Sequence, residues 1–238
     1  MSGVQPIELL PDLLYKYLPP ERIDILESMQ IRFSRPSEFN DIFDSHFLVP
    51  RSQGGKAIAN RFRWKVQLGV FCLAERPDNH LMWVDYASSH TGFVVGFDAH
   101  APFFGADGRV LRKVEYRKKP KVALEVDMNA CFDKSETWKH EEEWRCVRRF
   151  DHKEPREVAI EPSLIRQIIF GAKMEAWHKA KIMFVAKAYE MTKTMTFLLS
   201  QPSSPSWSIE IRPTNVAVCD KCDGDGYVME DLKTPTKE

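Results

Sequence analysis

The segment from Lys134 to Arg145 constrains this chain more than any other, because it places several acidic residues beside two tryptophans and an arginine. A turn or short helix is predicted to end near Trp138. From Glu141 to Val147 the residues alternate roughly as they do in a half-buried strand. We therefore expect a strand with two chemically different faces.

One face of this strand is charged, and the other anchors it in a core. Side chains on a strand point alternately to opposite sides of the sheet. The charged face is expected to hold Glu141, Glu143 and Arg145, with Val147 as an exception to the pattern, and the opposite face Glu142, Trp144 and Cys146. Two carboxylates beside a guanidinium form either a solvated ladder of charges or the floor of a site.

The composition is typical of one large folded domain, or of one domain with an appendage. Of the 238 residues, 43% are hydrophobic and 15 are phenylalanine, which is enough for a substantial core. The sequence has no apolar run long enough to span a membrane, and its first residues lack the pattern of a secretory signal. The five cysteines are then expected as reduced thiols or metal ligands. We expect a cytoplasmic protein without a membrane partner.

The charge pattern leaves a nucleic-acid partner open. The formal net charge is zero, from 34 basic and 34 acidic residues, which excludes a globally basic nucleic-acid binder but allows a local patch. One basic stretch, interleaved with Phe62 and Trp64, contains Arg51, Lys56, Arg61, Arg63 and Lys65. A second contains Arg112, Lys113, Arg117, Lys118, Lys119 and Lys121. Such stretches can grip phosphates, and solvated surfaces balanced by nearby acids are the alternative.

Many short strands broken by helices, without a regular β-α-β rhythm, predict an α+β fold with mixed or antiparallel sheets and flanking helices. Strands are expected at residues 9–17, 31–33, 68–73, 91–97, 110–116, 141–147, 158–160, 165–170 and 207–211. Helices are expected at residues 19–29, 56–67, 79–88, 122–132 and 176–189. We expect residues 1–199 to form the core domain, and residues 200–238 to hold a linker at 200–206, the last strand and a cysteine-containing tail.

Several short motifs follow one another in a recognisable order: Leu14–Tyr17, Ile31–Ser34, Phe39–Asp44, Met82–Ala87, Thr91–Asp98, Val114–Tyr116, Lys134–Arg145 and Ile168–Gly171. This order resembles a bacterial family described as a domain of unknown function, family 2971. The resemblance covers residues 13 to 175. Where the family has Asn-Asp-Pro-Phe-Glu, this chain has Ile42 in place of proline and Asp44 in place of glutamate. Asp44 keeps the carboxylate on a shorter side chain, and loss of the proline loosens the turn.

The layout is also similar to the ADP-ribosyltransferase superfamily, especially its DNA-modifying toxin branch. That superfamily places an aromatic residue, His or Arg on an early strand, a Ser, Thr or Tyr on a second strand, and a Glu on a late one. Tyr15 or Tyr17, Ser34 and Glu143 would fill those places. The similarity implies an ADP-ribosyltransferase-like fold and NAD as a substrate. It also implies transfer to a nucleic acid or a protein, as in a toxin or a phage-defence effector.

This resemblance implies a small set of functional groups. Cleaving the nicotinamide–ribose bond develops positive charge on the ribose, so a carboxylate is needed beside the sugar. Glu143 is the first candidate for this catalytic group, and Glu141 is the second. The candidates to stack on nicotinamide are Tyr15, Tyr17, Trp83 and Tyr86, and the candidates to bind the pyrophosphate are Lys16, Lys134 and Arg145.

Two of these motifs also have purely structural interpretations. Asn40 and Asp41 form either an Asx turn after a strand or, with Asp44, a group that binds a ribose hydroxyl or a metal ion. Trp83 and Tyr86 lie at helical spacing, so burial in the core is the alternative to contact with a ligand. The sequence contains neither a Gly-x-Gly-x-x-Gly fingerprint nor a Walker loop, so a Rossmann or P-loop mode of nucleotide binding is not expected.

The tail carries a separate motif. Cys219 and Cys222 lie in a Cys-x-x-Cys-x-Gly-x-Gly pattern that resembles one zinc-binding repeat of DnaJ-type chaperones. A closed zinc site needs four ligands, and this motif supplies two. The others would come from a histidine, from another cysteine of the chain, or from a second copy in a zinc-linked homodimer. A flexible, oxidisable tail is the alternative.

Two further classes of function remain open on the sequence. A non-catalytic module would use the basic stretch to bind nucleic acid or a partner and the cysteine tail to set assembly. A metal-dependent nuclease would arrange Asp41, Asp44, Glu141 and Glu143 around Mg²⁺.

Overall fold

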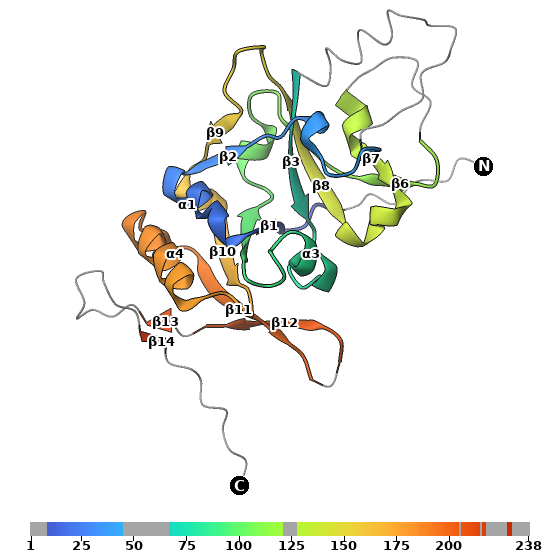
Figure 1. Ribbon diagram of the computed structural model, residues 1–238. Helices are drawn as coiled ribbons and strands as arrows, with labels where there is room; N and C mark the ends of the chain where they lie inside the picture. The colour runs from blue at the N-terminus through green and yellow to red at the C-terminus, as the bar shows by residue number, and fades with distance from the viewer. Residues whose placement is uncertain are drawn as a thin grey trace, which may run out of the picture.

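The computed structural model describes residues 9–44, 67–120, 128–204 and 206–214, together with the backbone of residues 216–217 and 228–229. Within these ranges the chain has an α+β fold, in which one large mixed sheet is combined with short helices (Figure 1). None of the helices in these ranges is long and apolar enough to cross a membrane.

The large sheet has the strand order β12–β11–β10–β4–β1–β3–β8–β5. Its strands in chain order are β1 (Leu13–Leu18), β3 (Leu68–Ala74), β4 (Phe93–Asp98), β5 (Val110–Lys113), β8 (Glu143–Arg149), β10 (Ile165–Phe170), β11 (Thr196–Pro202) and β12 (Ile209–Pro213). Only β10 and β11 pair in parallel among these neighbours. A parallel pair needs a crossover, and α4 (Ala176–Ala188) supplies it.

The remaining elements are short. Two-stranded sheets join β2 (Gln30–Arg32) to β9 (Glu157–Ala159), β6 (Glu115–Arg117) to β7 (Asp133–Ser135), and β13 (Val216–Ala217) to β14 (Val228–Met229). The other α-helices are α1 (Asp24–Ser28) and α3 (His80–Asp85). The 3-10 helices are η1 (Pro20–Ile23), η2 (Pro36–Glu38), η4 (Pro102–Gly105), η5 (Met128–Phe132), η6 (Glu136–Glu141), η7 (Pro162–Leu164) and η8 (Met191–Lys193).

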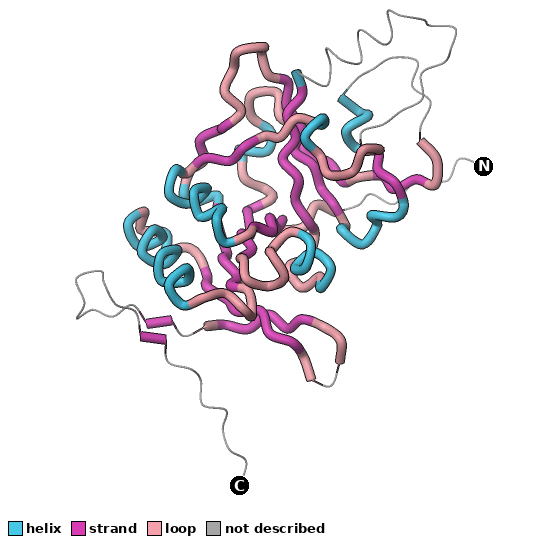
Figure 2. The backbone as a smooth tube through the Cα atoms, in the orientation of Figure 1, coloured by secondary structure: helices cyan, strands magenta, loops and turns pink. Residues whose placement is uncertain are grey.

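The main hydrophobic core lies between one face of the sheet and the pair α1 and α4, which Figure 2 shows side by side. Phe71, Trp144 and Ile168 contribute to it from three different strands. The two helices are also joined at the surface, where the Lys181 Nζ and the Glu27 carboxylate lie 2.8 Å apart. The expected role of Trp144 as an anchor of β8 in the core is confirmed, since it is only 6% exposed.

The opposite face of the sheet carries two smaller hydrophobic clusters. One, around Val70 and Val147, is covered by η5, and the other, around Tyr17 and Ala74, is covered by α3. The charged side chains of β8 lie on this second face, on the same side as Val147. The expected alternation along β8 is therefore observed.

The sheet opens between β1 and β3. These strands share one register pair, Tyr15 opposite Ala74, whereas β1 pairs with β4 along its whole length. Farther along β3, the main chain of Ser34 takes the place of β1 by forming an isolated bridge with Val70, at 2.9 and 3.0 Å. The opening between these two contacts leaves room for side chains and a cavity.

The structure corrects several predicted bounds. The first strand, expected from residue 9, begins at Leu13, and the turn or short helix expected to end near Trp138 is η6, which ends at Glu141. β8 begins at Glu143, because Glu141 ends η6 and Glu142 adopts a left-handed φ of 45°. The strand expected at 110–116 is divided between β5 and β6, which belong to different sheets. The expected linker at 200–206 is partly strand, since β11 runs to Pro202, and the last strand begins at Ile209.

One predicted domain boundary falls inside a strand, and two predicted helices lie partly outside the described residues. The expected domain division at residue 200 lies within β11, and β12 continues the same sheet. The helix expected at 56–67 lies outside the described residues except for Gln67. The helix expected at 122–132 is described only from residue 128, where it is 3-10 helix.

Gly171 lies in a closely packed position on the second face of the sheet. A Cβ at this position would overlap the carbonyl oxygens of His90 and Gly92, which are backbone atoms and cannot rotate away. We expect Gly171→Ala to lower the free energy of unfolding by about 1–3 kcal/mol, measured by urea denaturation. Gly105→Ala is the matched control, since nothing lies within 4 Å of its added Cβ. Equal stability of the two variants would contradict this packing.

Candidate functional site

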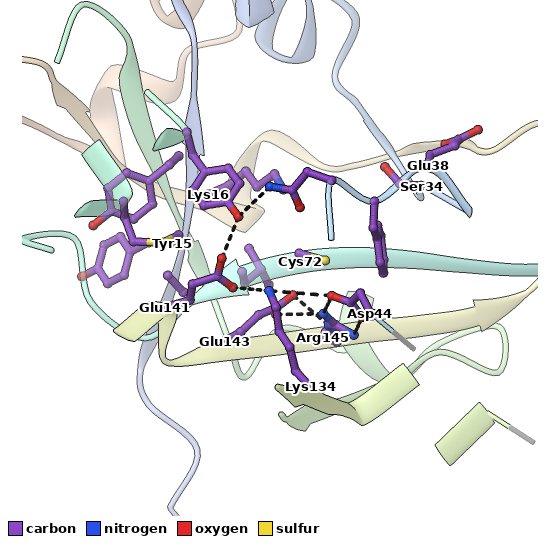
Figure 3. Close-up of a pocket in the computed structure, with 17 residues that line it drawn as sticks. Tyr15, Lys16, Ser34, Glu38, Asp44, Cys72, Lys134, Glu141, Glu143 and Arg145 are labelled. Carbon is purple, nitrogen blue, oxygen red and sulfur yellow. Dashed lines mark hydrogen bonds and ion pairs between the residues drawn. The ribbon is translucent and has the colours of Figure 1, made fainter. Parts of the chain in front are cut away.

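A cavity of about 300 Å³ lies where the sheet opens between β1 and β3 (Figure 3). Its floor is formed by β1, β3 and β8, and its walls by α3, β7, η6 and the segment from residue 34 to residue 44. The lining residues are Tyr15, Lys16, Tyr17, Ser34, Glu38, Phe39, Asn40, Asp44, Cys72, Leu73, Ala74, Met82, Tyr86, Lys134, Glu141, Glu143 and Arg145.

Arg145 is the most extensively bonded side chain in this cavity, and it is 1% exposed. Its Nε and Nη2 donate to the two oxygens of Glu143 at 2.8 and 2.9 Å. Its Nη1 and Nη2 donate to the two oxygens of Asp44 at 2.8 and 2.6 Å, and Nη1 also donates to the carbonyl oxygen of Cys131 at 2.6 Å. A guanidinium has five N–H donors, so all of them are used.

Lys134 joins the two glutamates. Its Nζ donates to Glu141 and, at 3.0 Å, to Glu143, and it lies 3.7 Å from the carboxylate of Asp44. The ring of Trp138 lies beside the same ammonium, 5.2 Å from its centroid. One lysine and one arginine thus face three carboxylates, and the dashed lines in Figure 3 mark their bonds. All five side chains are buried.

Tyr86 binds the second glutamate from the other wall. Its hydroxyl donates to Glu141 Oε1 at 2.6 Å and accepts a longer bond of 3.4 Å from Asn40 Nδ2. Asn79 sets the position of α3, because its side-chain oxygen caps the helix at Leu81 and Met82 while its Nδ2 donates to the carbonyl oxygen of His140. The same cap therefore positions the helix that carries Tyr86 against the turn that carries Glu141.

The two glutamates have pKa values shifted in opposite directions. Burial by itself would raise the pKa of Glu143, but the charges of Arg145 and Lys134 outweigh it and lower the pKa to about 2. Burial raises the pKa of Glu141, and the charge of Lys134 offsets this only in part. The site thus holds one firmly ionised carboxylate beside one that is more easily protonated, a combination typical of acid–base sites.

Cys72 is the one thiol in the cavity lining. It lies opposite Arg145 on β3 and hydrogen-bonds to Glu143. Burial and the nearby Glu143 charge raise the pKa of Cys72, so it is a neutral thiol at pH 7. A neutral thiol is a poor nucleophile, which makes Cys72 a structural neighbour of the carboxylates.

The structure brings most of the sequence-predicted site residues to this one cavity. These are Tyr15, Lys16, Tyr17, Ser34, Asn40, Tyr86, Lys134, Glu141, Glu143 and Arg145. The charged face of the predicted strand is buried, so it is not a solvated ladder of surface charges. Glu141 reaches the cavity from η6 and not from the strand itself.

Two predicted residues are placed elsewhere. Trp83 is fully buried, donates its indole N–H to the carbonyl oxygen of Pro77 at 2.8 Å, and packs edge-on against Tyr17. Its structural interpretation as a core residue is confirmed. Asp41 does not line the cavity, and it accepts the backbone N–H of Phe43 at 2.9 Å in the expected Asx turn.

The predicted zinc ligands Cys219 and Cys222 lie outside the described residues, as does the basic stretch from residue 51 to residue 65. Among the residues that are described, no group of three or more His, Cys, Asp or Glu side chains is arranged to hold a metal ion.

Sequence reasoning missed some contributors. Phe39 covers the Arg145 guanidinium at 5.2 Å, and Cys72 lies opposite it on the neighbouring strand. The sequence suggests Asp44 as a ribose or metal ligand, whereas in the structure it pairs with an arginine 101 positions away. Only the β3–β8 register and the fold of the 34–44 segment bring these residues together, and no local signal in the sequence records either.

Comparison of the chain with protein-family models, with curated proteins and with solved structures finds no match.

The Arg145 bonds lead to a stability prediction. Arg145→Ala leaves Glu143 and Asp44 buried without their main counter-charge, so we expect a loss of roughly 3–5 kcal/mol in the free energy of unfolding. Arg149→Ala on the same strand is the control, because Arg149 is exposed and its truncation should change stability by about 0.5 kcal/mol or less. Urea denaturation of both variants would measure this, and a small effect of Arg145→Ala would contradict the network.

The Glu143 pKa leads to a pH prediction. A carboxyl whose folded pKa of about 2 lies below its usual value of 4.5 contributes stability above that value, and this contribution is lost as the pH falls toward 2. We expect the wild type to lose stability over this window, with Glu143 contributing on the order of a few kcal/mol of that loss. Glu143→Gln should be less stable than the wild type at neutral pH, and its free energy of unfolding should change less between pH 4.5 and pH 2. The free energy of unfolding of Glu142→Gln should follow that of the wild type. Parallel curves for wild type and Glu143→Gln would contradict the assignment.

Proposed function

We propose that this protein is an ADP-ribosyltransferase-like enzyme that cleaves the nicotinamide–ribose bond of NAD and transfers ADP-ribose to a nucleic acid or a protein. The observation that carries the proposal is the cavity, in which two glutamates of opposite pKa shift lie beside tyrosine rings and a lysine. The resemblance of the motif order in the sequence to family 2971, and of its layout to ADP-ribosyltransferases, supports the proposal. The cavity of about 300 Å³ suits one nucleoside half of a dinucleotide.

In this proposal the two glutamates have different roles. Glu143 accepts hydrogen bonds from Arg145, Lys134 and Cys72, so its oxygens are occupied and it acts as a fixed negative charge. Glu141 accepts bonds from Lys134 and Tyr86 among the described residues, which leaves acceptor capacity for a ribose hydroxyl or an incoming nucleophile. This reverses the order of the sequence-based candidates.

The chemistry follows from those roles. The bond between the nicotinamide nitrogen and the ribose C1′ breaks, its electron pair leaves with nicotinamide, and C1′ becomes cationic. The ionised carboxylates of Glu143 and Glu141 stabilise this cation. As that bond breaks, a nucleophile on the acceptor, or water where no acceptor is bound, forms a bond to C1′ and gives its proton to ionised Glu141, so nicotinamide release depends on this base. The raised pKa of Glu141 makes it a better base than an ordinary glutamate.

Of the three cations that the sequence suggests for the pyrophosphate, only Lys16 remains suitable. Arg145 and Lys134 are bound to carboxylates, so neither suits a pyrophosphate. Lys16, whose Nζ lies 5.6 Å over the Phe71 ring, has no carboxylate partner among the described residues and is the better candidate. Tyr15 is half-buried and faces the cavity, which suits it to stack on the nicotinamide ring.

One observation favours a second candidate function, a non-catalytic binding module. Arg145 uses all of its donors within the protein, as it would in a purely structural cluster. In that case the carboxylates hold the 34–44 segment in place, and the cavity binds its ligand without turnover.

Titration with NAD separates these functions. We expect NAD at about 100 times its Kd to add about 2.7 kcal/mol to the free energy of unfolding, read by thermal shift, and nicotinamide to be released. Glu141→Gln should abolish release while keeping a native melting transition. Glu142→Gln makes the same chemical change one residue away, outside the cavity, and should release nicotinamide as the wild type does. Full nicotinamide release by Glu141→Gln would contradict the assignment of Glu141 as the base. NAD binding without release in the wild type would favour the non-catalytic binding module.

Tyr86→Phe gives a gentler test of the same base. Removing the hydroxyl takes away a hydrogen bond that lowers the pKa of Glu141, so this pKa should rise further. If ionised Glu141 is the base, the acidic limb of the pH–rate profile should move to higher pH. An unchanged profile would count against the role.

A further inference from the structure

A second and larger cavity, of about 660 Å³, lies on the other side of α3. Met82 and Tyr86 face the first cavity, whereas His80 and Val84 line the second. The far wall is the connection between β11 and β12, at residues 202–204 and 206–209. In Figure 1 this connection and α3 lie on the same side of the molecule.

A column of rings forms one wall. The His80 and His90 rings stack at 5.4 Å, and His90 stacks in turn on Trp83 at 5.8 Å with an interplanar angle of 6°. His80, at the outer end, is exposed and lines the cavity. A flat ligand ring placed there would extend the column by one member.

His90 carries an unpaired polar atom. The residue is only 9% exposed, and its Nδ1 is buried without a hydrogen-bond partner among the described residues. Burial, together with nearby His80 and Lys173, lowers the pKa of His90, so the ring is neutral at pH 7. No ion pair therefore compensates for the missing hydrogen bond at Nδ1. A buried polar atom without a partner is unfavourable, and it shows that the polar groups of this wall are not all satisfied by the described residues.

The opposite wall supplies a second ring. Trp207 is fully exposed, at 105% of its reference area, although it lines the cavity. Covering an exposed indole with a flat apolar surface lowers the free energy of the system. The cavity therefore has aromatic groups on both sides.

The charged residue that lines the cavity favours a negatively charged ligand. The residues that line the cavity include Lys173, two histidines and several serines, and no carboxylate. The backbone N–H of Lys173 donates to the carbonyl oxygen of His90 at 3.0 Å, which fixes the lysine next to the ring column. The Ser203 hydroxyl already donates to Glu210, and the Ser206 and Ser208 hydroxyls bond to each other. Lys173, a cation beside aromatic surfaces, is therefore the group that suits an anion on a flat ring.

We propose that this cavity is a binding site for a planar aromatic anion, with its ring between His80 and Trp207 and its negative group on Lys173. A nucleoside monophosphate has this chemistry, and an aromatic carboxylate shares it. The site is separate from the cavity of the proposed transferase and does not depend on that function.

Isothermal titration of the full chain with AMP, adenosine and indole-3-carboxylate tests the site. We expect saturable AMP binding that weakens at least tenfold in Trp207→Ala and in Lys173→Ala, both changes of exposed side chains. Adenosine should bind more weakly than AMP and equally to wild type and Lys173→Ala, because it lacks the anion. Trp177→Ala and Lys187→Ala, exposed residues of α4, are matched controls and should bind AMP as the wild type does.

The outcomes separate the sources of binding. Indole-3-carboxylate binding with the same dependence on both residues, in the absence of AMP binding, would support an aromatic carboxylate as the ligand. AMP binding that survives Trp207→Ala but is lost in Glu141→Gln would place AMP in the first cavity and overturn the proposal. An absence of binding by all three probes would also overturn it.

Discussion

The buried guanidinium of Arg145 is the interaction on which the candidate site depends. It reaches from β8 to the 34–44 segment through Asp44, and to η5 through the carbonyl oxygen of Cys131. Moving such charges out of water is costly, and the arrangement is stable only because each donor has an acceptor. Those bonds also fix Glu143 as an ionised group and leave Glu141 as the carboxyl with the raised pKa.

The sheet makes room for this cluster. The main core occupies one face, where α1 and α4 cover it, so the other face can hold two smaller clusters with charges between them. Because β1 leaves β3 after a single register pair and Ser34 takes its place at Val70, an opening remains between them. The cavity is thus a consequence of strand divergence, lined by side chains of both strands.

The helix α3 connects the two cavities. Its cap at Asn79 joins it to η6, its residues Met82 and Tyr86 face the carboxylates, and His80 and Val84 face the ring column. A short helix shared in this way has little freedom to move one face without the other.

The sequence by itself determined the α+β class, most of the strands, and the two faces of β8, because strand periodicity and turn residues are local signals. Motif order also indicated most of the residues that line the first cavity. Only the tertiary structure decided that the charged face is buried, that Asp44 pairs with Arg145, that Trp83 is a core residue, and that Glu141 lies on a turn. These features depend on strand register, on where the sheet opens, and on one left-handed residue, Glu142, and such long-range geometry leaves no local pattern in the chain.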